Sequence, residues 1–295
     1  MNTINTHYRL SHRIQDEAFS LEQAAQCNLY IALSQKAIRL AVANAERNKF
    51  VVLEDYELIT VFSPLQVAEQ LRLIAQENEL LQEQNWKLVR VSVSNQHFTL
   101  VPETLYDPAY QQEYLKLHSD FNPAQDKVLS YRHSVLEAIN IFAMDGALHQ
   151  ALVDLYPERP AQVVHLTSSL IRSMLHQTPR TNPRSMYAFV ERNYVTLLVI
   201  GPGGLEFCNI FHYVSPEDFI YYIIFIMQEQ KMNPEQETIT VWGDITHDSS
   251  LFNILQKYIR QIKLGKKPAD ADYSYKFHDM FEHRYFELYS LNLCE

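Results

Sequence analysis

The chain has 295 residues, of which 47% are hydrophobic and 20% charged, and its formal net charge is −10. This length accommodates two domains, or one duplicated unit, each with a real core. The composition is that of a globular protein and marks no part of the chain as disordered. Because the negative charge repels a phosphate backbone over most of the surface, we do not expect nucleic-acid binding.

Three widely spaced cysteines argue against a disulfide framework and for a reducing compartment. Residues 1–12 are polar and carry no apolar signal segment. The longest apolar run, Phe219–Met227, spans nine residues, whereas a bilayer-spanning helix needs roughly 20. We therefore expect a cytoplasmic protein without a transmembrane segment.

The first half of the chain predicts a three-stranded meander, a capped helix and a further strand. Residues 1–27 are interpreted as an extended lead-in or short edge strand. The helix begins at Ser63-Pro64, where Gln66 completes a capping box. It is expected to reach Leu80. The strands are expected at Leu29–Leu33, Ala37–Ala43, Phe50–Phe62 and Lys87–Val93.

A mixed region follows and ends in a dense turn-forming run, Thr178–Pro183. We place a lobe boundary there, which gives lobe I as residues 1–180 and lobe II as residues 181–295. Residues 103–180 form either an inserted subdomain or a run of lobe-I elements. The expected strands are Phe98–Val101, Leu136–Met144 and Val163–Leu166, and the expected helices are Ala109–Leu117, Gly146–Tyr156 and Ser168–Gln177.

The second half repeats the order of the first. A helix is expected to begin at Ser215-Pro216, with Asp218 in the place of Gln66. The meander strands are expected at Met186–Val190, Val195–Ile200 and Leu205–Val214, the later strand at Thr238–Trp242, and a last helix at Leu251–Ile262, capped by Asp248 or Ser249. Such a repeat at matched spacing favours a structural duplication.

This duplication resembles the ribonuclease-H-like lobes of the actin, sugar-kinase and heat-shock-chaperone superfamily. The hairpin Val195–Phe207, the helix from Ser215 and the strand Ile239–Gly243 look most like PilM and FtsA. The chain also resembles a bacterial domain-of-unknown-function family, through Leu100–Pro102 and Tyr285–Tyr289. The resemblance implies an α/β fold of two actin-like ATPase lobes, each a mixed sheet with a three-stranded antiparallel meander and flanking helices.

The departures from that superfamily concern its phosphate loops. Active members carry Asp-x-Gly turns, where glycine allows the main chain to approach a phosphate. Neither Leu33–Lys36 nor Phe189–Tyr194 contains such a turn, and the glycine pair on the adenosine side is replaced by Gly243-Asp244. We therefore expect a pseudo-ATPase without a cofactor, and ATP with Mg²⁺ only under the alternative below.

The candidate ligand-binding residues follow two expected strand ends of lobe II: Glu191, Arg192, Asn193, Gly243 and Asp244. In the functional interpretation they contact a ligand in an inter-lobe cleft. In the alternative they form a polar hairpin turn and a loop. No catalytic or metal-binding residue is predicted. The cluster His278–His283 fits no zinc spacing and is assigned to packing or solvation, and Lys263, Lys266 and Lys267 to a solubilising loop rather than an anion-binding site.

These observations favour a non-catalytic actin-like scaffold that engages a protein or peptide partner, with a homodimer as one alternative. A divergent ATP-binding ATPase or phosphotransferase that uses Asp244 or Glu191 is the other function we consider.

Overall fold

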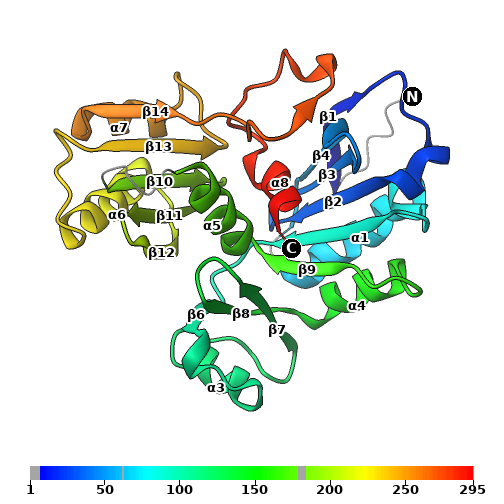
Figure 1. Cartoon of the computed structure of the whole chain (residues 1–295), viewed down its shortest axis with the longest axis horizontal. Coiled ribbons are helices and arrows are strands. Elements are labelled where there is room, and N and C mark those ends of the chain that lie inside the picture. The colour runs from blue at the N-terminus through cyan, green and yellow to red at the C-terminus, as the bar shows by residue number, and fades with distance from the viewer. Residues whose placement is uncertain (1–6, 62, 179–183, 295) are drawn as a thin grey trace. The chain divides into compact units, whose positions relative to one another are not determined.

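The computed structural model describes residues 7–61, 63–178 and 184–294. The chain folds into two compact units, one of residues 1–169, 269–279 and 294–295, the other of residues 170–268 and 280–293 (Figure 1). Most of the turn-forming run Thr178–Pro183 lies outside the described residues, as does Phe62. Across the described ranges, no helix has the length and apolar character needed to cross a membrane.

The first unit is built on a seven-stranded sheet whose main path runs β1-β4-β3-β2-β5-β9. Strands β2, β3 and β4 form the antiparallel meander, and β5 and β9 continue the sheet in parallel. The outer side of β4 is covered by β1, which runs antiparallel to it, and by the short β15. The strands are β1 (Tyr8–Gln15), β2 (Cys27–Leu33), β3 (Ala37–Asn44), β4 (Lys49–Leu58), β5 (Leu88–Val93), β9 (Gln162–His165) and β15 (Asp272–Tyr273).

The capping box at Ser63 starts α1 (Pro64–Glu77) as expected. Ser63 Oγ accepts the N–H of Gln66, and Gln66 Oε1 accepts the N–H of Ser63 at 3.1 Å. The helix ends before Leu80, because Asn78 leaves the helical conformation and caps a second short helix, α2 (Glu79–Gln82). Asn78 Nδ2 also donates to Glu54 Oε2 on β4 at 2.6 Å. A tertiary hydrogen bond therefore accompanies a break that the local pattern does not indicate.

A separate three-stranded antiparallel sheet, in the order β6-β8-β7, lies within the first unit (Figure 1). Its strands are β6 (Phe98–Pro102), β7 (Asp126–His133) and β8 (Ala138–Asp145), and α3 (Gln111–Lys116) packs on it. Its own small core consists of Val101, Leu115, Phe121, Ile139, Ile141 and Ala143. The sequence analysis missed β7, whose side chains are mostly half-buried or exposed and which pairs with β8. Helix α4 (Gly146–Leu155) follows and packs against α1.

The second unit is a five-stranded sheet in the order β12-β11-β10-β13-β14 (Figure 1). The meander is antiparallel, and β13 and β14 extend it in parallel. The strands are β10 (Ser185–Val190), β11 (Tyr194–Gly201), β12 (Gly204–His212), β13 (Thr238–Gly243) and β14 (Gln261–Leu264). This order matches β4-β3-β2-β5-β9 of the first unit, so the predicted repeat of meander, capped helix and parallel strand is present in both units.

Helices cover both faces of the second sheet. On one face, α6 (Pro216–Glu229) and α7 (Ser250–Tyr258) form a continuous core with the sheet. On the other face, the ring of Trp242 packs at 4.8 Å from Phe286 of α8 (Phe286–Ser290). Ser215 caps α6 with its Oγ on the N–H of Asp218, and Asp218 Oδ2 accepts the N–H of Ser215. The apolar run Phe219–Met227 is therefore helical, as its cap indicates, and α6 buries one face in the core of the unit.

The predicted last helix, Leu251–Ile262, is wrong at its C-terminal end. Helix α7 ends at Tyr258, and the next residues turn back to form β14. Ile262 pairs with Ile239 of β13 in the parallel register. The apolar residues at the end of the predicted helix therefore belong to a strand, since a non-local partner rather than local periodicity decides this segment.

Candidate functional site

The carboxyl ends of β10 and β13 bring the predicted candidates of the second unit to one edge of the sheet. Val190 lies opposite Gly243 in the parallel register. The turn that carries Glu191, Arg192 and Asn193 therefore lies beside Gly243 and Asp244. The carboxyl ends of parallel strands form the usual ligand edge of such α/β sheets.

The turn at Glu191 is closed by hydrogen bonds of its own main chain. The Glu191 N–H donates to the Tyr194 carbonyl at 2.8 Å, and Tyr213, just after β12, donates its N–H to the Asn193 carbonyl at 2.9 Å. The Tyr213 hydroxyl donates to the Glu191 carbonyl at 2.6 Å. These bonds hold the turn as a polar hairpin connection in which the Glu191 amide faces its own strand pair.

Gly243 is required by close packing of the main chain. Its φ is +93°, and a Cβ there would lie 2.1 Å from the Val190 carbonyl oxygen. The Asp244 N–H donates to that same oxygen at 2.7 Å, and the Gly243 N–H donates to the His283 carbonyl at 2.9 Å. A glycine at this position is therefore explained by contacts within the unit, without a bound phosphate.

The charges at this edge are partly compensated within the second unit. Asp244 Oδ1 lies 3.9 Å from Arg284 Nε, and each side chain is about one-third exposed. Burial, together with the negative charges of Asp244 and Glu191, raises the pKa of the Tyr213 hydroxyl. Tyr213 is thus kept protonated and serves as a hydrogen-bond donor rather than as a base.

His283 lies behind Asp244 as a buried, neutral side chain. Burial lowers its pKa below the ordinary value for histidine, and its Nε2 contacts the Ile245 carbonyl at 2.6 Å. His278, Asp279 and Glu282 of the same cluster are exposed. Asp248 accepts a hydrogen bond from Thr246, and Ser249 is the residue that caps α7. Within the residues that the structure describes, no group of three or more histidine, cysteine or acidic side chains could hold a metal ion.

At the matching edge of the first unit, the main-chain N–H groups also find their hydrogen-bond partners within the protein. Ser34 donates its N–H to the Ala37 carbonyl at 3.0 Å. Its Oγ accepts the N–H groups of Lys36 at 3.4 Å and Ala37 at 3.1 Å. The Ser94 N–H donates to the Leu33 carbonyl, just as Asp244 donates to Val190 in the second unit. The amides that would face a phosphate in an Asp-x-Gly turn are therefore hydrogen-bonded to a serine of the same turn.

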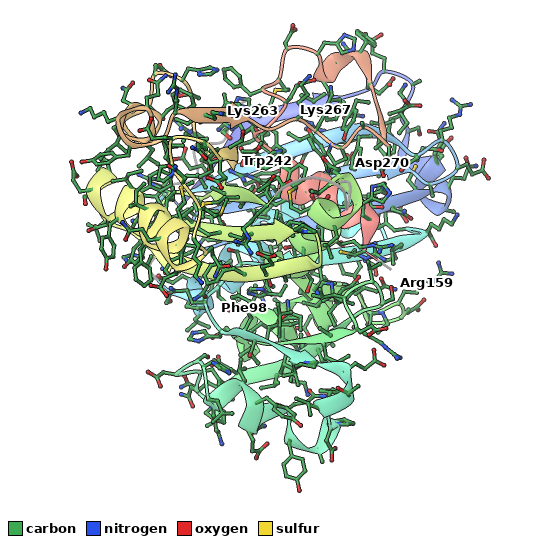
Figure 2. The ribbon with its side chains drawn as sticks, turned by 60° about the vertical axis from the view of Figure 1, so that its left-hand side comes forward. Phe98, Arg159, Trp242, Lys263, Lys267 and Asp270 are labelled. Atoms are coloured by element: carbon green, nitrogen blue, oxygen red, sulfur yellow. The ribbon has the colours of Figure 1, made fainter. Side chains whose placement is uncertain are left out.

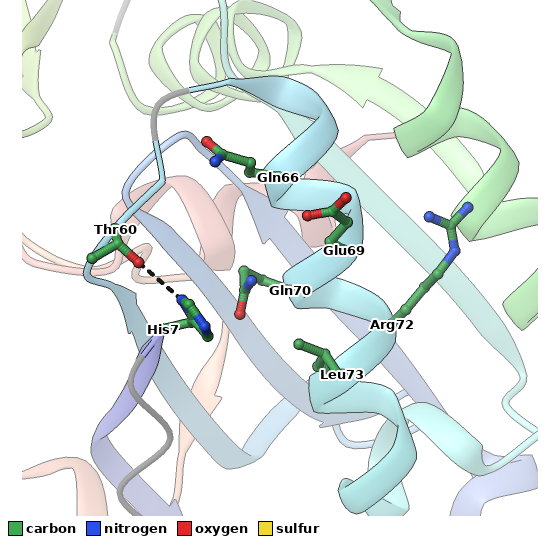
Figure 3. A pocket seen from close by; sticks show the side chains of 7 residues that line it. All are labelled: His7, Thr60, Gln66, Glu69, Gln70, Arg72 and Leu73. Atoms are coloured by element: carbon green, nitrogen blue, oxygen red, sulfur yellow. Dashed lines mark hydrogen bonds between the residues drawn. The ribbon is translucent and has the colours of Figure 1, made fainter.

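A different hollow, of about 630 Å³, lies beside α1 in the first unit (Figure 3). Six of the seven residues that line it are of polar or charged types: His7, Thr60, Gln66, Glu69, Gln70 and Arg72, with Leu73 as the seventh. His7 Nδ1 contacts Thr60 Oγ1 at 3.1 Å. The buried Gln70 Oε1 has no hydrogen-bond partner among the described residues. The hollow is therefore suited to a ligand that donates a hydrogen bond to Gln70.

The sequence analysis missed Tyr213, His283 and Arg284 as neighbours of the candidate edge. Tyr213 precedes the predicted cap of α6, and its contact with Glu191 depends on the meander register. His283 and Arg284 come from a C-terminal segment whose position the strand pattern does not indicate. The hydrophobic and turn signals of the chain carry no information on these contacts.

Residues 16–262 match a family described as "Protein of unknown function (DUF3822)". The chain belongs to this family. One solved structure similar to this chain is a Bacteroides thetaiotaomicron VPI-5482 protein with an actin-like ATPase fold and unknown function. The TM-score is 0.80 and the identity 20%, over 94% of this chain and 99% of that chain. The PilM–PilN type IV pilus biogenesis complex contains a chain similar to it with a TM-score of 0.54 and 11% identity, over 90% and 97% of the two chains. No curated relative matches the chain by sequence.

These similarities confirm the fold expected from the sequence. The chain has the actin-like ATPase fold, with mixed sheets and flanking helices. They also confirm the resemblance to a domain-of-unknown-function family and to PilM. At these levels of identity the solved structures bear on the fold alone.

Proposed function

We propose that this DUF3822 protein is a cytoplasmic, non-catalytic actin-like scaffold, a pseudo-ATPase that engages a protein or peptide partner. One observation carries the proposal: Ser34 Oγ takes the amide N–H groups of Lys36 and Ala37 in the turn where an active member would present amides to phosphate. Catalysis of phosphoryl transfer depends on donors that are aimed at the transferring group in advance. Donors already bonded within the protein supply little of that stabilisation.

The second unit supports the same proposal. The turn Glu191–Asn193 is closed by Tyr194 and Tyr213, and Gly243 serves the contact with Val190. Asp244, the carboxylate that an ATPase would use, has Arg284 as a neighbour. The similarity to PilM, which forms a complex with PilN, fits a fold used for protein binding.

The test is a nucleotide titration of this protein. We expect no ATP-dependent heat by calorimetry, no rise in the melting temperature with ATP and Mg²⁺, and no phosphate release above a buffer control. A ligand at 100 times its Kd would stabilise the folded state by about 2.7 kcal/mol, so binding would be readily detected. An actin-like ATPase measured in parallel serves as the positive control.

The alternative ATPase makes the opposite prediction. Saturable ATP binding with phosphate release, abolished by Asp244→Asn or Glu191→Gln, would overturn the scaffold proposal. The matched variant Asp248→Asn, in the loop that leads to α7, should leave any such activity unchanged. Nucleotide binding that survives all three substitutions would also contradict the proposal and would place the nucleotide elsewhere.

A further inference from the structure

The hollow beside α1 lies between one face of that helix and two residues that flank the edge of the sheet. Its volume of about 630 Å³ is within the range of small-ligand sites. His7 and Thr60 form one side: the Ile59 N–H donates to the His7 carbonyl at 3.0 Å, and the His7 ring contacts Thr60. Gln70 and Leu73 of α1, three residues apart and so on one helix face, form the other side (Figure 3).

Gln70 is a buried polar residue of this hollow whose hydrogen bonding is incomplete. It is 6% exposed, and its Oε1 has no hydrogen-bond partner among the residues that the structure describes. Such an acceptor is destabilising, because it has lost its water without gaining a donor. Figure 3 shows the Gln70 amide on the side of α1 that faces His7, and the terminal torsion of glutamine is broad. A donor bound in the hollow can therefore supply the missing bond.

The charges at the hollow favour a donor that is cationic. Glu69 lines the hollow and is exposed, and its carboxylate has no hydrogen bond or ion pair within the described part of the chain. Arg72 is engaged by α4: its Nη2 donates to the Ala147 carbonyl at 3.4 Å and lies 3.9 Å from Asp154 Oδ2. Figure 3 shows the Arg72 side chain extending away from Gln70. A carboxylate and an amide oxygen thus remain as acceptors for a ligand.

We propose that the hollow binds a primary ammonium group carried on an aliphatic stem. The ammonium donates an N–H to Gln70 Oε1 and is attracted by the Glu69 carboxylate. The stem packs on Leu73, which is 36% exposed. A hydrogen bond from a charged donor is stronger than one between neutral groups. The net charge of −10 also favours the approach of a cation.

Two sources can present this group: a free alkylamine, or a lysine side chain of a bound peptide. The site itself does not depend on the proposed function, because an ATPase could hold the same hollow. The lysine source does rest on the proposed function, since it gives the peptide partner a basic residue. The experiment therefore includes a probe for each source.

The ligand test uses two amines and one matched neutral compound. Pentylamine represents the free amine, N-acetyl-lysine methylamide represents the peptide, and N-acetyl-norleucine methylamide keeps an aliphatic stem without the ammonium. In ligand-observed NMR titrations of this protein we expect saturable amine binding with a Kd of roughly 1 mM. Binding of both amines supports the shared site, and binding of one alone also identifies the source. No amine binding, or equal binding of the norleucine compound, would overturn the proposal.

Substitutions at the two acceptors locate the ammonium. Gln70→Met removes the amide and Glu69→Gln removes the negative charge, so each should weaken amine binding by about tenfold or more. The matched variant Glu46→Gln makes the same charge change in the exposed turn between β3 and β4 and should leave binding unchanged. Amine binding that survives both Gln70→Met and Glu69→Gln would contradict the proposed site.

Gln70→Met also tests the incomplete hydrogen bonding without any ligand. Because the buried Oε1 has no partner, its replacement by an apolar group of similar length should leave the urea midpoint unchanged or raise it. Gln76→Met, at an exposed position of the same helix, is the matched control. A midpoint well below that of the control would show that the Gln70 amide is bonded within the protein, and would overturn the proposal.

Phosphate release measured on the same samples separates this site from the proposed function. ATP turnover together with intact amine binding would sink the scaffold proposal and leave the ammonium site standing. Absence of both turnover and amine binding would do the reverse.

Discussion

The two meanders of this protein share a topology and differ at their ends. In the first unit, β2 and β5 end at Leu33 and Val93, and the outer side of β4 is covered by β1 and β15. In the second, β10 and β13 end at Val190 and Gly243, and β12 is an edge strand. Both turns at the carboxyl ends are bonded internally. A duplicated fold can therefore keep its pattern of strand pairing in both units. The residues at the carboxyl ends of the parallel strands, and the covering of the outermost meander strand, can still differ between them.

The largest effect on stability is expected from a substitution at the end of the parallel strand that follows each meander, which is Val93 in β5 and Gly243 in β13. Gly243→Ala should cost at least ~3 kcal/mol of unfolding free energy, because the new Cβ overlaps the Val190 carbonyl at a positive φ. Urea unfolding measures it. Trp86 is buried in the first unit and Trp242 in the second, so fluorescence of a Trp86→Phe background reports the second unit.

The matched control for this prediction is Gly203→Ala. A Cβ at Gly203 meets nothing within 4 Å, and its φ is not in the left-handed region. We expect a change within about 0.5 kcal/mol. If Gly243→Ala were equally mild, the close contact between the ends of β10 and β13 would be wrong.

A pH titration compares buried histidines of the two units. Burial lowers the pKa of His165 to about 3, and it also lowers the pKa of His283. The folded protein therefore keeps these rings neutral, while the unfolded chain takes up protons near the ordinary value of about 6.5. Stability is full above that value and is lost as the pH falls toward the folded-state pKa. For His165 the loss between pH 7 and pH 5 should be about 2 kcal/mol.

Variants of His165 test this slope. The ring is fully buried and stacks on Phe98, whose position Figure 2 shows, and its Nε2 lies 3.1 Å from the Asn95 carbonyl oxygen. His165→Gln should lower stability at pH 7 and flatten its dependence on pH in urea denaturation monitored through Trp86. The exposed His118→Gln should leave the slope as it is. An unchanged slope in His165→Gln would contradict the assignment.

The two capping boxes should respond alike. Ser63→Ala and Ser215→Ala each remove one side-chain acceptor from a helix N-terminus, and each should cost about 1 kcal/mol. Matched substitutions at Gln66→Ala and Asp218→Ala remove the reciprocal bond. Denaturant midpoints of the two units, read through Trp86 and Trp242, provide the comparison. A cost in one unit only would show that the boxes are not energetically equivalent.

The smallest effect is expected at Asp244. Its partner Arg284 is 3.9 Å away, and both side chains are about one-third exposed. Asp244→Asn should therefore change the unfolding free energy by less than about 0.5 kcal/mol. A double-mutant cycle with Arg284→Gln measures the coupling directly. A coupling above ~2 kcal/mol would mean that this pair organises the edge far more than its exposure indicates.

Much of this fold follows from local signals. The serine-proline caps at Ser63 and Ser215 and the repeated meander predicted both halves, because capping boxes and alternating apolar residues are short-range features. The absence of Asp-x-Gly turns was also visible directly. The candidate residues Glu191 to Asn193, Gly243 and Asp244 could be placed beside one another because parallel strands end at a common edge; their role in ligand binding stays a prediction.

The tertiary structure decided what local patterns leave open. Strand β14 exists because Ile262 finds Ile239 on β13, and β7 because it pairs with β8. Gly243 is needed because the Val190 carbonyl lies against it, and the Ser34 hydroxyl takes the amides of its own turn. These contacts depend on strand pairing and on turn geometry, and neither can be read from the sequence alone. The sequence by itself therefore determined the repeated elements, and only the packed chain decided which sheet edge is covered and which groups at the carboxyl edge are already bonded.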